Sequence, residues 1–426
     1  MQNHLDPRRE RVLLAGCQLS DETNERFSHS MDELKALTDT AYGETVAEVT
    51  QKREKIDPAL YIGKGKVGEI ARLVDELDVD TVIFNDELSP GQSGNLAAKL
   101  GTNVIDRTQL ILDIFAGRAQ SKEGMLQVEL AQLKYLLPRL TGKGTALSRL
   151  GGGIGTRGPG ETKLEQDRRY IRRRIADIER RLEAIVSHRE RYRERRKRNQ
   201  RFQISLVGYT NAGKSTLFNQ LTNADSFEED RLFATLDPLT RKLPLPSGLT
   251  VLISDTVGFI QDLPTTLIAA FRSTLEEVRE ADLILHVIDA SNPDFEQHER
   301  TVLSLLKELG AAHIPILTVY NKIDRLEQPF IASPETNAVT LSALEKQDIS
   351  RLEKEIEGMV KEEMAYYHAS IPLSEGKLLA KLETGSLIDQ KEVDEAGEFV
   401  EVKGFIFPDR PLYAELKPFV PGWEGK

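Results

Sequence analysis

The feature that most constrains this chain is the stretch GYTNAGKS, which lies between an apolar run and a helical pattern. It begins at Gly208, after FQISLV, and ends at Ser215, where STLFNQLT opens a helix. This is G-x-x-x-x-G-K-[ST] in the strand, loop and helix context that a phosphate-binding loop requires. Its glycines let backbone N–H groups converge on a phosphate, and the helix N-terminus adds partial positive charge. The stretch therefore predicts a Ras-like P-loop domain, which we place at residues 202–364.

Two further groups are expected to act on the phosphates and on a magnesium ion. Lys214 would neutralise the β and γ phosphates, while the Ser215 hydroxyl would ligate Mg²⁺. The segment DTVG follows the apolar strand TVLIS, so Asp255 stands at a strand end where it can hold Mg²⁺ through a water. Gly258 of the same segment would offer its N–H to the γ phosphate and so sense whether that phosphate is present.

The segment NKID, at the end of the strand IPILTVY, predicts that the base is guanine. The Asp324 carboxylate can accept two N–H bonds from guanine, and adenine has neither donor in that place. A site built for such bonds discriminates strongly, because the wrong base leaves a carboxylate unpaired. A metabolic kinase needs no guanine reader, so this motif argues against that class. Ser342 and Ala343, after the strand AVTL, would contact the guanine carbonyl.

The run RLFATLDPLTR lies between the first two motifs and supplies the remaining expected contacts. Thr235 is the expected second protein ligand of Mg²⁺, with Thr240 as a competitor. Ordinary turn chemistry also favours Asp, Asn, Gly and Ser, but four motifs in order at strand ends make that alternative improbable. The complete set expected to contact GTP is Gly208, Tyr209, Thr210, Asn211, Ala212, Gly213, Lys214, Ser215, Thr216, Phe233, Ala234, Thr235, Asp255, Thr256, Val257, Gly258, Asn321, Lys322, Asp324, Ser342 and Ala343.

The residue after Gly258 departs from the Ras pattern. Ras-like enzymes carry there the glutamine that orients the attacking water, whereas this chain has Phe259. We therefore expect slow intrinsic hydrolysis, with water positioned by a partner or by another group.

The first part of the chain, residues 1–108, predicts a small α/β domain with a largely parallel sheet. Apolar runs alternate there with helical patterns, at Val12–Gly16, Glu22–Leu37, Thr45–Val49, Val67–Leu77, Thr81–Asn85, Leu96–Leu100 and Asn103–Asp106. Such alternation is typical of parallel sheets with crossover helices. Cys17, the one cysteine, ends an apolar run and excludes an intrachain disulfide.

Residues 109–201 predict an antiparallel helical hairpin. One seam is formed by Leu126, Leu130, Leu133, Leu137 and Leu140, and a second by Leu164, Ile171, Ile175, Ile178, Leu182 and Ile185. Both seams have heptad spacing, which is typical of paired helices joined by a loop. The last 62 residues, 365–426, predict a small α/β domain with a helix at Ser374–Leu382 and strands at Phe399–Val402 and Leu412–Leu416.

The loop between the two seams, residues 141–161, contains GGGIGTRGPGE and is expected to be a long, exposed hairpin tip. Gly153, Gly155 and Gly158 spell G-x-G-x-x-G, but no strand precedes them, so a dinucleotide fingerprint is improbable. The residues expected to contact RNA from this tip are Arg149, Gly151, Gly153, Gly155, Arg157 and Gly158.

The charge of the chain is unevenly distributed. The whole chain carries −11, yet between Lys163 and Arg201 there are 16 Lys or Arg against 7 Asp or Glu. Such a basic segment can bind nucleic acid, because its cations neutralise phosphates and release their counterions. The alternative is a charged helix face that is simply exposed to solvent. No apolar run approaches the length of a membrane-spanning helix, and no leader is visible at the N-terminus. We expect a cytoplasmic protein, with partial membrane association left open.

Several motifs outside the nucleotide site resemble the HflX family of ribosome-associated GTPases. They are YIGKGKV at Tyr61–Val67, NDELSP at Asn85–Pro90, QVELAQLKYLLPRL at Gln127–Leu140, GGGIGTRGPGET at Gly151–Thr162, FATLDPLTR and DTVGFI. The resemblance covers nearly the whole chain and implies the domain order given above. It also implies binding to the large ribosomal subunit, through rRNA and ribosomal proteins, and splitting or rescue of stalled ribosomes under stress. Ribosomes would then stimulate GTP hydrolysis.

Two further expectations concern ions and partners. Asn211 looks like the P-loop asparagine of GTPases that use K⁺, although the side chain could simply satisfy the loop backbone. We expect a monomer when the protein is free. The competing function is a regulatory module whose GTP state controls docking to a protein or a membrane; the absence of a lipidation motif weakens the membrane version.

Overall fold

The structure is a computed structural model of the 426-residue chain. It describes residues 8–140, 163–199, 202–222, 233, 239–260, 278–328, 330, 337–394 and 397–421. The side chains of 163–164 and 186–199 are outside this description, as is the glycine-rich loop expected at 141–161. The chain divides by its contacts into two compact units. Unit 1 is Met1–Val186 with Asp230–Asp237 and Ile260–Arg272, and unit 2 is Ser187–Glu229, Pro238–Phe259 and Ser273–Lys426.

Unit 1 is built on a 4-stranded parallel sheet in the order β2-β1-β3-β4. Its strands are β1 (Glu10–Leu19), β2 (Gly43–Arg53), β3 (Thr81–Phe84) and β4 (Asn103–Asp106). Its crossover helices are α1 (Asn24–Thr40), α2 (Lys64–Glu76) and α3 (Pro90–Leu100). The start of α3 follows from its sequence, because Ser89 and Gln92 form a capping box and Pro90 occupies the first turn. This α/β domain agrees with the class predicted from the sequence.

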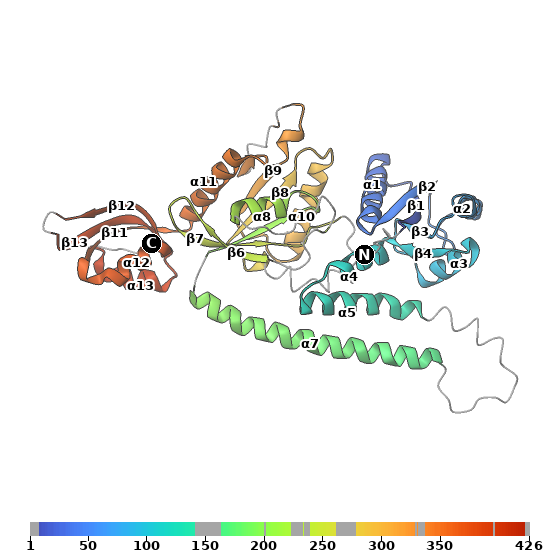
Figure 1. Cartoon of the computed structure of the whole chain (residues 1–426), viewed down its shortest axis with the longest axis horizontal. Helices are drawn as coiled ribbons and strands as arrows, with labels where there is room; N and C mark the ends of the chain where they lie inside the picture. The colour runs from blue at the N-terminus through green and yellow to red at the C-terminus, as the bar shows by residue number, and fades with distance from the viewer. Residues whose placement is uncertain are drawn as a thin grey trace, which may run out of the picture. The chain divides into compact units, whose positions relative to one another are not determined.

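Three helices follow the sheet of unit 1: α4 (Arg107–Arg118), α5 (Lys122–Arg139) and α7 (Lys163–Asn199). Figure 1 shows α5 and the first part of α7 running side by side in opposite directions. Ion pairs join them among the described side chains: Arg174 Nε lies 2.6 Å from Glu129 Oε1, and Lys134 Nζ lies 2.7 Å from Glu179 Oε1.

The leucine seam predicted on the first of these helices is only partly buried. Of its five leucines only Leu130 is buried, and the buried face of α5 is formed mainly by Gln127, Val128, Ala131 and Tyr135. The helix turns this face toward α4, with which it pairs. The region predicted to form the hairpin begins within α4, and Ser121 then caps α5 as a separate helix.

Unit 2 contains a 6-stranded sheet in the order β10-β9-β8-β5-β7-β6, in which only β6 is antiparallel to its neighbour. The strands are β5 (Gln203–Gly208), β6 (Leu239–Pro244), β7 (Thr250–Asp255), β8 (Leu283–Asp289), β9 (Ile316–Asn321) and β10 (Ala338–Thr340). Its described helices are α8 (Lys214–Thr222), α10 (Phe295–Glu308), η1 (Ile323–Arg325) and α11 (Lys346–Glu362). Apolar side chains of β5, β7, β8 and β9 pack with α8 and α11 in one core. Because these strands are parallel, the loops at their carboxyl ends meet at one edge.

The C-terminal part of unit 2 is a 3-stranded antiparallel sheet in the order β11-β13-β12. Its elements are β11 (Ala365–Pro372), η2 (Leu373–Glu375), α12 (Gly376–Gly385), β12 (Leu387–Val393), β13 (Phe399–Ile406), α13 (Pro411–Leu416) and η3 (Lys417–Phe419). The strand predicted at Leu412–Leu416 is wrong, because these residues form α13 with Pro411 in the first turn. No described helix is long and apolar enough to cross a membrane.

Candidate functional site

The loop between β5 and α8 places Lys214 at the centre of the candidate site. Its Nζ donates to the carbonyl oxygens of Gly208 and Tyr209, at 3.0 and 2.7 Å. Burial lowers the pKa of Lys214 to about 8, with Asp255 opposing this shift and Lys322 adding to it. An anionic phosphate in the same place would favour the charged ammonium, so this lysine is poised to pair with one.

Ser215 and Asp255 come together at the adjoining strand ends. The Ser215 hydroxyl lies 2.9 Å from Asp255 Oδ2, and Asp255 ends β7 beside β5. Thr256 fixes this segment by donating from Oγ1 to the Leu206 carbonyl at 2.6 Å. A hydroxyl and a carboxylate are the hard oxygen donors that Mg²⁺ prefers, so the pair fits that ion.

The competing magnesium ligand, Thr240, lies in a different setting. It is part of β6, where its Oγ1 is 2.9 Å from Ser254 Oγ on β7. Thr235 and Ala234 lie outside the described residues. Phe233 is described, and its buried ring packs edge-on against Phe115 of α4 at 4.5 Å within unit 1. Its carbonyl accepts a bond from Arg118 Nη1 at 3.2 Å.

The NKID segment is bonded directly to the P-loop. Asn321 Nδ2 donates to the Ala212 carbonyl at 2.9 Å, and Lys322 Nζ donates to the Asn211 carbonyl at 2.7 Å. A side chain on Gly213 would run into the Asn321 amide, which explains the glycine there. The phosphate loop and the base-reading segment are therefore held in one frame.

The serine–alanine segment after β10 joins the same frame. Asn321 Oδ1 accepts the Ala343 N–H at 2.9 Å, while Asp348 of α11 accepts the Ser342 N–H at 2.8 Å. Asp324 lies in η1 with its side chain exposed, where a base could meet its carboxylate. The structure thus brings the P-loop, NKID and serine–alanine residues together at one edge of the sheet.

Phe259 is buried beside the P-loop. Its side chain is 1% exposed, and its backbone is paired with the P-loop through Thr210 N–H to Phe259 O at 2.7 Å and Phe259 N–H to Gly208 O at 3.1 Å. Gly258 lies directly on the P-loop, since a side chain there would come within 2.8 Å of Thr210 Cγ2 and 3.1 Å of Lys214 Nζ. In this conformation the Phe259 ring cannot orient water at the phosphates.

Sequence reasoning missed three residues that support the site. His298 of α10 stacks on Tyr209 with ring centroids 3.7 Å apart and planes at 7°. Asp289, at the end of β8, pairs with Lys322 at 2.8 Å, and Asp348 holds Ser342 as described above. Asp289 could have been found from its place at a strand end; His298 and Asp348 sit in helices and carry no local signal.

His286 lies in the centre of β8, beside Val207 of the neighbouring strand β5. It is 1% exposed, and neither ring nitrogen has a hydrogen-bond partner among the described residues. Burial lowers its pKa to about 3, and Lys214 adds to the shift. The imidazole therefore stays neutral in the folded protein.

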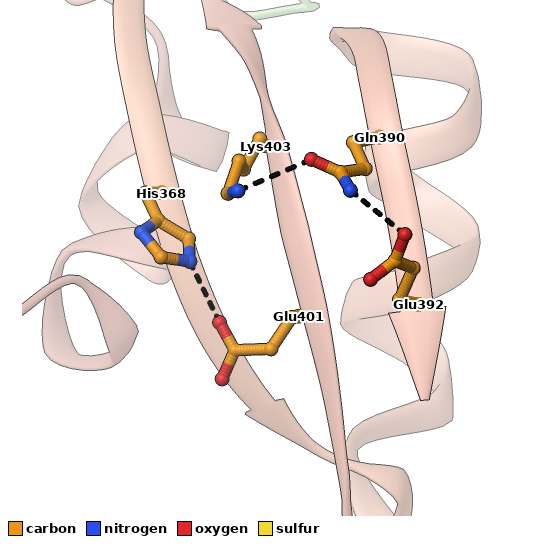
Figure 2. A pocket seen from close by; sticks show the side chains of 5 residues that line it. All are labelled: His368, Gln390, Glu392, Glu401 and Lys403. Atoms are coloured by element: carbon orange, nitrogen blue, oxygen red, sulfur yellow. Dashed lines mark hydrogen bonds and ion pairs between the residues drawn. The ribbon is translucent and has the colours of Figure 1, made fainter. Parts of the chain in front are cut away.

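A separate polar pocket of about 260 Å³ lies on the C-terminal sheet. Figure 2 shows its five side chains, with His368 bonded to Glu401 at 2.8 Å and Lys403 to Gln390 at 3.1 Å. A hydrogen bond from Ser370, with His368 adding to it, holds the pKa of Glu401 below its ordinary value. These lining groups satisfy one another across neighbouring strands.

Comparison with known proteins identifies the family. Three family models match the chain: "GTP-binding GTPase N-terminal" at residues 28–116, "GTP-binding GTPase Middle Region" at 118–196, and "50S ribosome-binding GTPase" at 203–322. The GTPase HflX of Alkalihalophilus pseudofirmus is 57% identical over 408 residues, covering 96% of each chain. This chain belongs to the HflX family of GTPases.

Two other proteins are similar to much of the chain. The GTPase HflX of Escherichia coli is 43% identical over 88% of this chain and 89% of its own. A GDP complex of a GTP-binding protein from Sulfolobus solfataricus covers 83% of this chain and 99% of its own, at 26% identity and a TM-score of 0.45. Membership of the HflX family makes the chain a P-loop GTP hydrolase, of a kind that generally uses Mg²⁺.

Proposed function

We propose that this HflX-family protein binds the large ribosomal subunit and uses GTP-dependent switching to split or rescue stalled ribosomes under stress. The observation that carries the proposal is the family itself, whose nucleotide-binding part matches a model described as a 50S ribosome-binding GTPase. The basic composition of α7 supports an RNA partner, because cations that neutralise phosphates release counterions.

In this proposal the site residues have the roles expected from their motifs. Lys214 exchanges its two backbone carbonyls for phosphate oxygens, and Ser215 with Asp255 holds Mg²⁺, directly and through water. Thr235 completes the protein ligands of the ion, which supplies charge stabilisation at the phosphates. Asp324 reads guanine, while Asn321 and Ala343 keep the base-reading segment on the P-loop.

The switch is the backbone pairing between Phe259 and the P-loop. Gly258 lies beside Lys214 and Thr210, so a γ phosphate bound by this lysine would act directly on the paired segment. GTP then favours one arrangement of the segment and GDP the other, as in GTPases whose loops are held by the γ phosphate. Phe259 positions no water, so the ribosome supplies or completes the catalytic arrangement.

We also propose that the tip, with Arg149 and Arg157, contacts rRNA, and that Asn211 helps to hold K⁺. Asn211 has a φ of 61°, a left-handed conformation that orders the loop at that point. A faster hydrolysis in potassium than in sodium at equal ionic strength supports the ion; equal rates contradict it.

Co-sedimentation with ribosomal subunits tests the proposal. The full-length protein with a non-hydrolysable GTP analogue should sediment with large subunits, and with GDP it should not. Lys214→Ala, which loses the phosphate contact, should stay in the supernatant with either nucleotide. Equal co-sedimentation with the GTP analogue and with GDP, or no co-sedimentation with either, would contradict the proposal. The competing function, a GTP-controlled module that docks to a protein partner, would then remain.

A further inference from the structure

Three family-like motifs play no part in the nucleotide site, and the structure brings them together in unit 1. They are YIGKGKV, NDELSP and the end of QVELAQLKYLLPRL. Tyr61 of the first donates its hydroxyl to Asp86 of the second and accepts the Cys17 N–H at 3.1 Å. The third meets the second at Leu88, as described below. All lie at the carboxyl edge of the sheet β2-β1-β3-β4.

This edge is where an open parallel sheet most often binds a ligand, at the point where the strand order reverses. Here the protein's own side chains fill it: Tyr61 and Asp106 are each 1% exposed, and Asn85 and Arg107 are 6% and 5% exposed. Arg107 Nη1 donates to Asn85 Oδ1 at 3.2 Å, and its Nη2 pairs with Glu33 of α1. The carboxyl edge of this sheet is therefore occupied by hydrogen bonds and ion pairs that join the loops after β2 and β3 with α1 and α4.

Arg139, the last residue of α5, is the member of this cluster that comes from the helical pair. Its Nη2 donates to the Leu88 carbonyl at 2.7 Å and to Asp106 Oδ2 at 3.2 Å. The guanidinium carbon also lies 3.4 Å from the centroid of the Tyr135 ring. Since Arg139 is 13% exposed and Asp106 1%, solvent screens this ion pair little.

The end of α5 is intrinsically weak without this contact. Pro138 lies in its last turn and has no N–H to donate, and helix ends leave carbonyls unsatisfied in any case. Arg139 Nη1 adds a side-chain donor to this turn, to the Tyr135 carbonyl at 3.0 Å. One planar guanidinium thus donates to its own helix, to the Leu88 carbonyl and to Asp106. The ammonium group of a lysine cannot reproduce this geometry.

We propose that Arg139 is a positioning residue that fixes the end of α5 on the α/β sheet, so that the chain enters the glycine-rich tip from a defined point. This inference rests on the proposed function, in which the tip acts on ribosomal RNA. A loop that leaves a fixed point loses less freedom on binding than one that leaves a frayed helix. The sheet edge then serves as the fixed support of α5 and does not bind a ligand.

The test uses the full-length protein with Arg139→Ala, Arg139→Lys and a matched control, Lys134→Ala. Lys134 lies on the same helix, carries the same charge, and makes an ion pair with Glu179 in which its side chain is 42% exposed. The first readout is hydrogen exchange in the last turn of α5, which needs no ribosome. Exchange should be faster in both Arg139 variants and unchanged in Lys134→Ala.

The second readout is GTP hydrolysis against the concentration of large subunits. Both Arg139 variants should raise the half-saturating concentration about tenfold, with the maximal rate and GTP affinity kept within about twofold. If Arg139 only stabilises the fold, its variants should lower the maximal rate in proportion to the folded fraction and leave the half-saturating concentration unchanged. That result would overturn the proposal. The proposal is also overturned if hydrogen exchange in the last turn of α5 is unchanged in the Arg139 variants, or if Arg139→Lys behaves as the wild type in both readouts. If the wild type is not stimulated at all, the proposed function fails, while the exchange result still decides whether Arg139 anchors α5.

Discussion

At the residue scale, the nucleotide site is a set of polar groups that hold one another before any ligand is considered. Asn321 binds the P-loop through its amide N–H and the Ala343 N–H through its amide oxygen. Lys322 reaches the P-loop and Asp289 together. This pre-organisation lowers the cost of ordering the site when GTP binds. Asp324 projects from this frame, so its side chain can be changed without disturbing the bonds that build the frame.

Asp324→Asn should therefore shift preference from GTP to xanthosine triphosphate. An amide can donate to the xanthine carbonyl where the carboxylate accepted from guanine, and GTP affinity should fall on the order of a hundredfold. Equilibrium titration with fluorescent nucleotides measures both affinities. The control is Glu327→Gln, an exposed carboxylate nearby that should change neither. Unchanged GTP affinity in the Asp324 variant would remove it from base reading.

Phe259→Gln should not create a faster GTPase. The side chain at this position points into the protein, so a glutamine there buries an amide instead of reaching a water. We expect an unchanged or lower basal rate and a loss of stability of about 2 kcal/mol or more. Single-turnover hydrolysis and thermal melting measure the two effects, with Phe259→Leu as the apolar control. A tenfold gain in basal rate would show that the segment turns outward on its own.

His286→Leu should make the protein less sensitive to acid. The native pKa of about 3 lies below the ordinary 6.5, so the stability due to neutral His286 is complete above pH 6.5 and falls below it. In that range the unfolded chain takes up a proton that the native chain refuses, which costs about 1.4 kcal/mol per pH unit. The melting temperature of the wild type should drop more between pH 7.5 and 5.5 than that of the variant. Equal drops would mean that His286 is protonated or solvated in the folded protein.

At the element scale, ion pairs contribute to joining the helices α5 and α7. Arg174 makes two bonds to Glu129, at 2.6 and 2.8 Å, yet both side chains are about a third exposed, at 33% and 37%. Glu129→Arg or Arg174→Glu alone should raise hydrogen exchange in α7, since like charges then meet. The effect should be about 0.5 to 1 kcal/mol, and the double swap should largely restore protection. Additive damage in the double variant would show that the pair does not couple the helices.

How far the sequence predicts these elements depends on whether a local signal exists. The strands β5 and β9 are nearly all buried and were predicted closely, because their short apolar runs end at motif residues that mark a strand end. β6 was missed, since only Leu243 of its six residues is buried and the strand reads as a loop. Five residues at Leu412–Leu416 fit a strand or a helix equally, and only Pro411 pointed to a helix start. The buried face of α5 is set by its packing on α4, which no single-helix pattern encodes.

The candidate site follows the same rule. Its P-loop, DTVG, NKID and serine–alanine residues were identifiable because each has a fixed spacing at a strand end. The stacking of His298 on Tyr209, and the role of Asp348, depend on where α10 and α11 pack, which is a tertiary matter. Arg139 was visible within a motif, but its partners, Leu88 and Asp106, lie on other elements.

At the scale of the whole molecule, the nucleotide site lies in one compact unit, and the N-terminal sheet with the α5–α7 pair lies largely in the other. If a GTPase divided in this way acts on ribosomes, we expect the nucleotide state to control when the tip engages the ribosome and the tip to make the contacts that split it. Ribosome binding should then raise the hydrolysis rate at least tenfold, a change of about 1.4 kcal/mol in the barrier.

The most direct measurement is dissociation of intact ribosomes, followed by light scattering, with GTP and the full-length protein. The comparison is a variant in which residues 142–160 are replaced by a four-residue turn, with Lys214→Ala as the nucleotide control. We expect the wild type to split ribosomes, the Lys214 variant to be inactive, and the shortened variant to bind GTP normally while splitting poorly. Splitting at the wild-type rate by the shortened variant, or no splitting by the wild type in any nucleotide, would contradict the central claim.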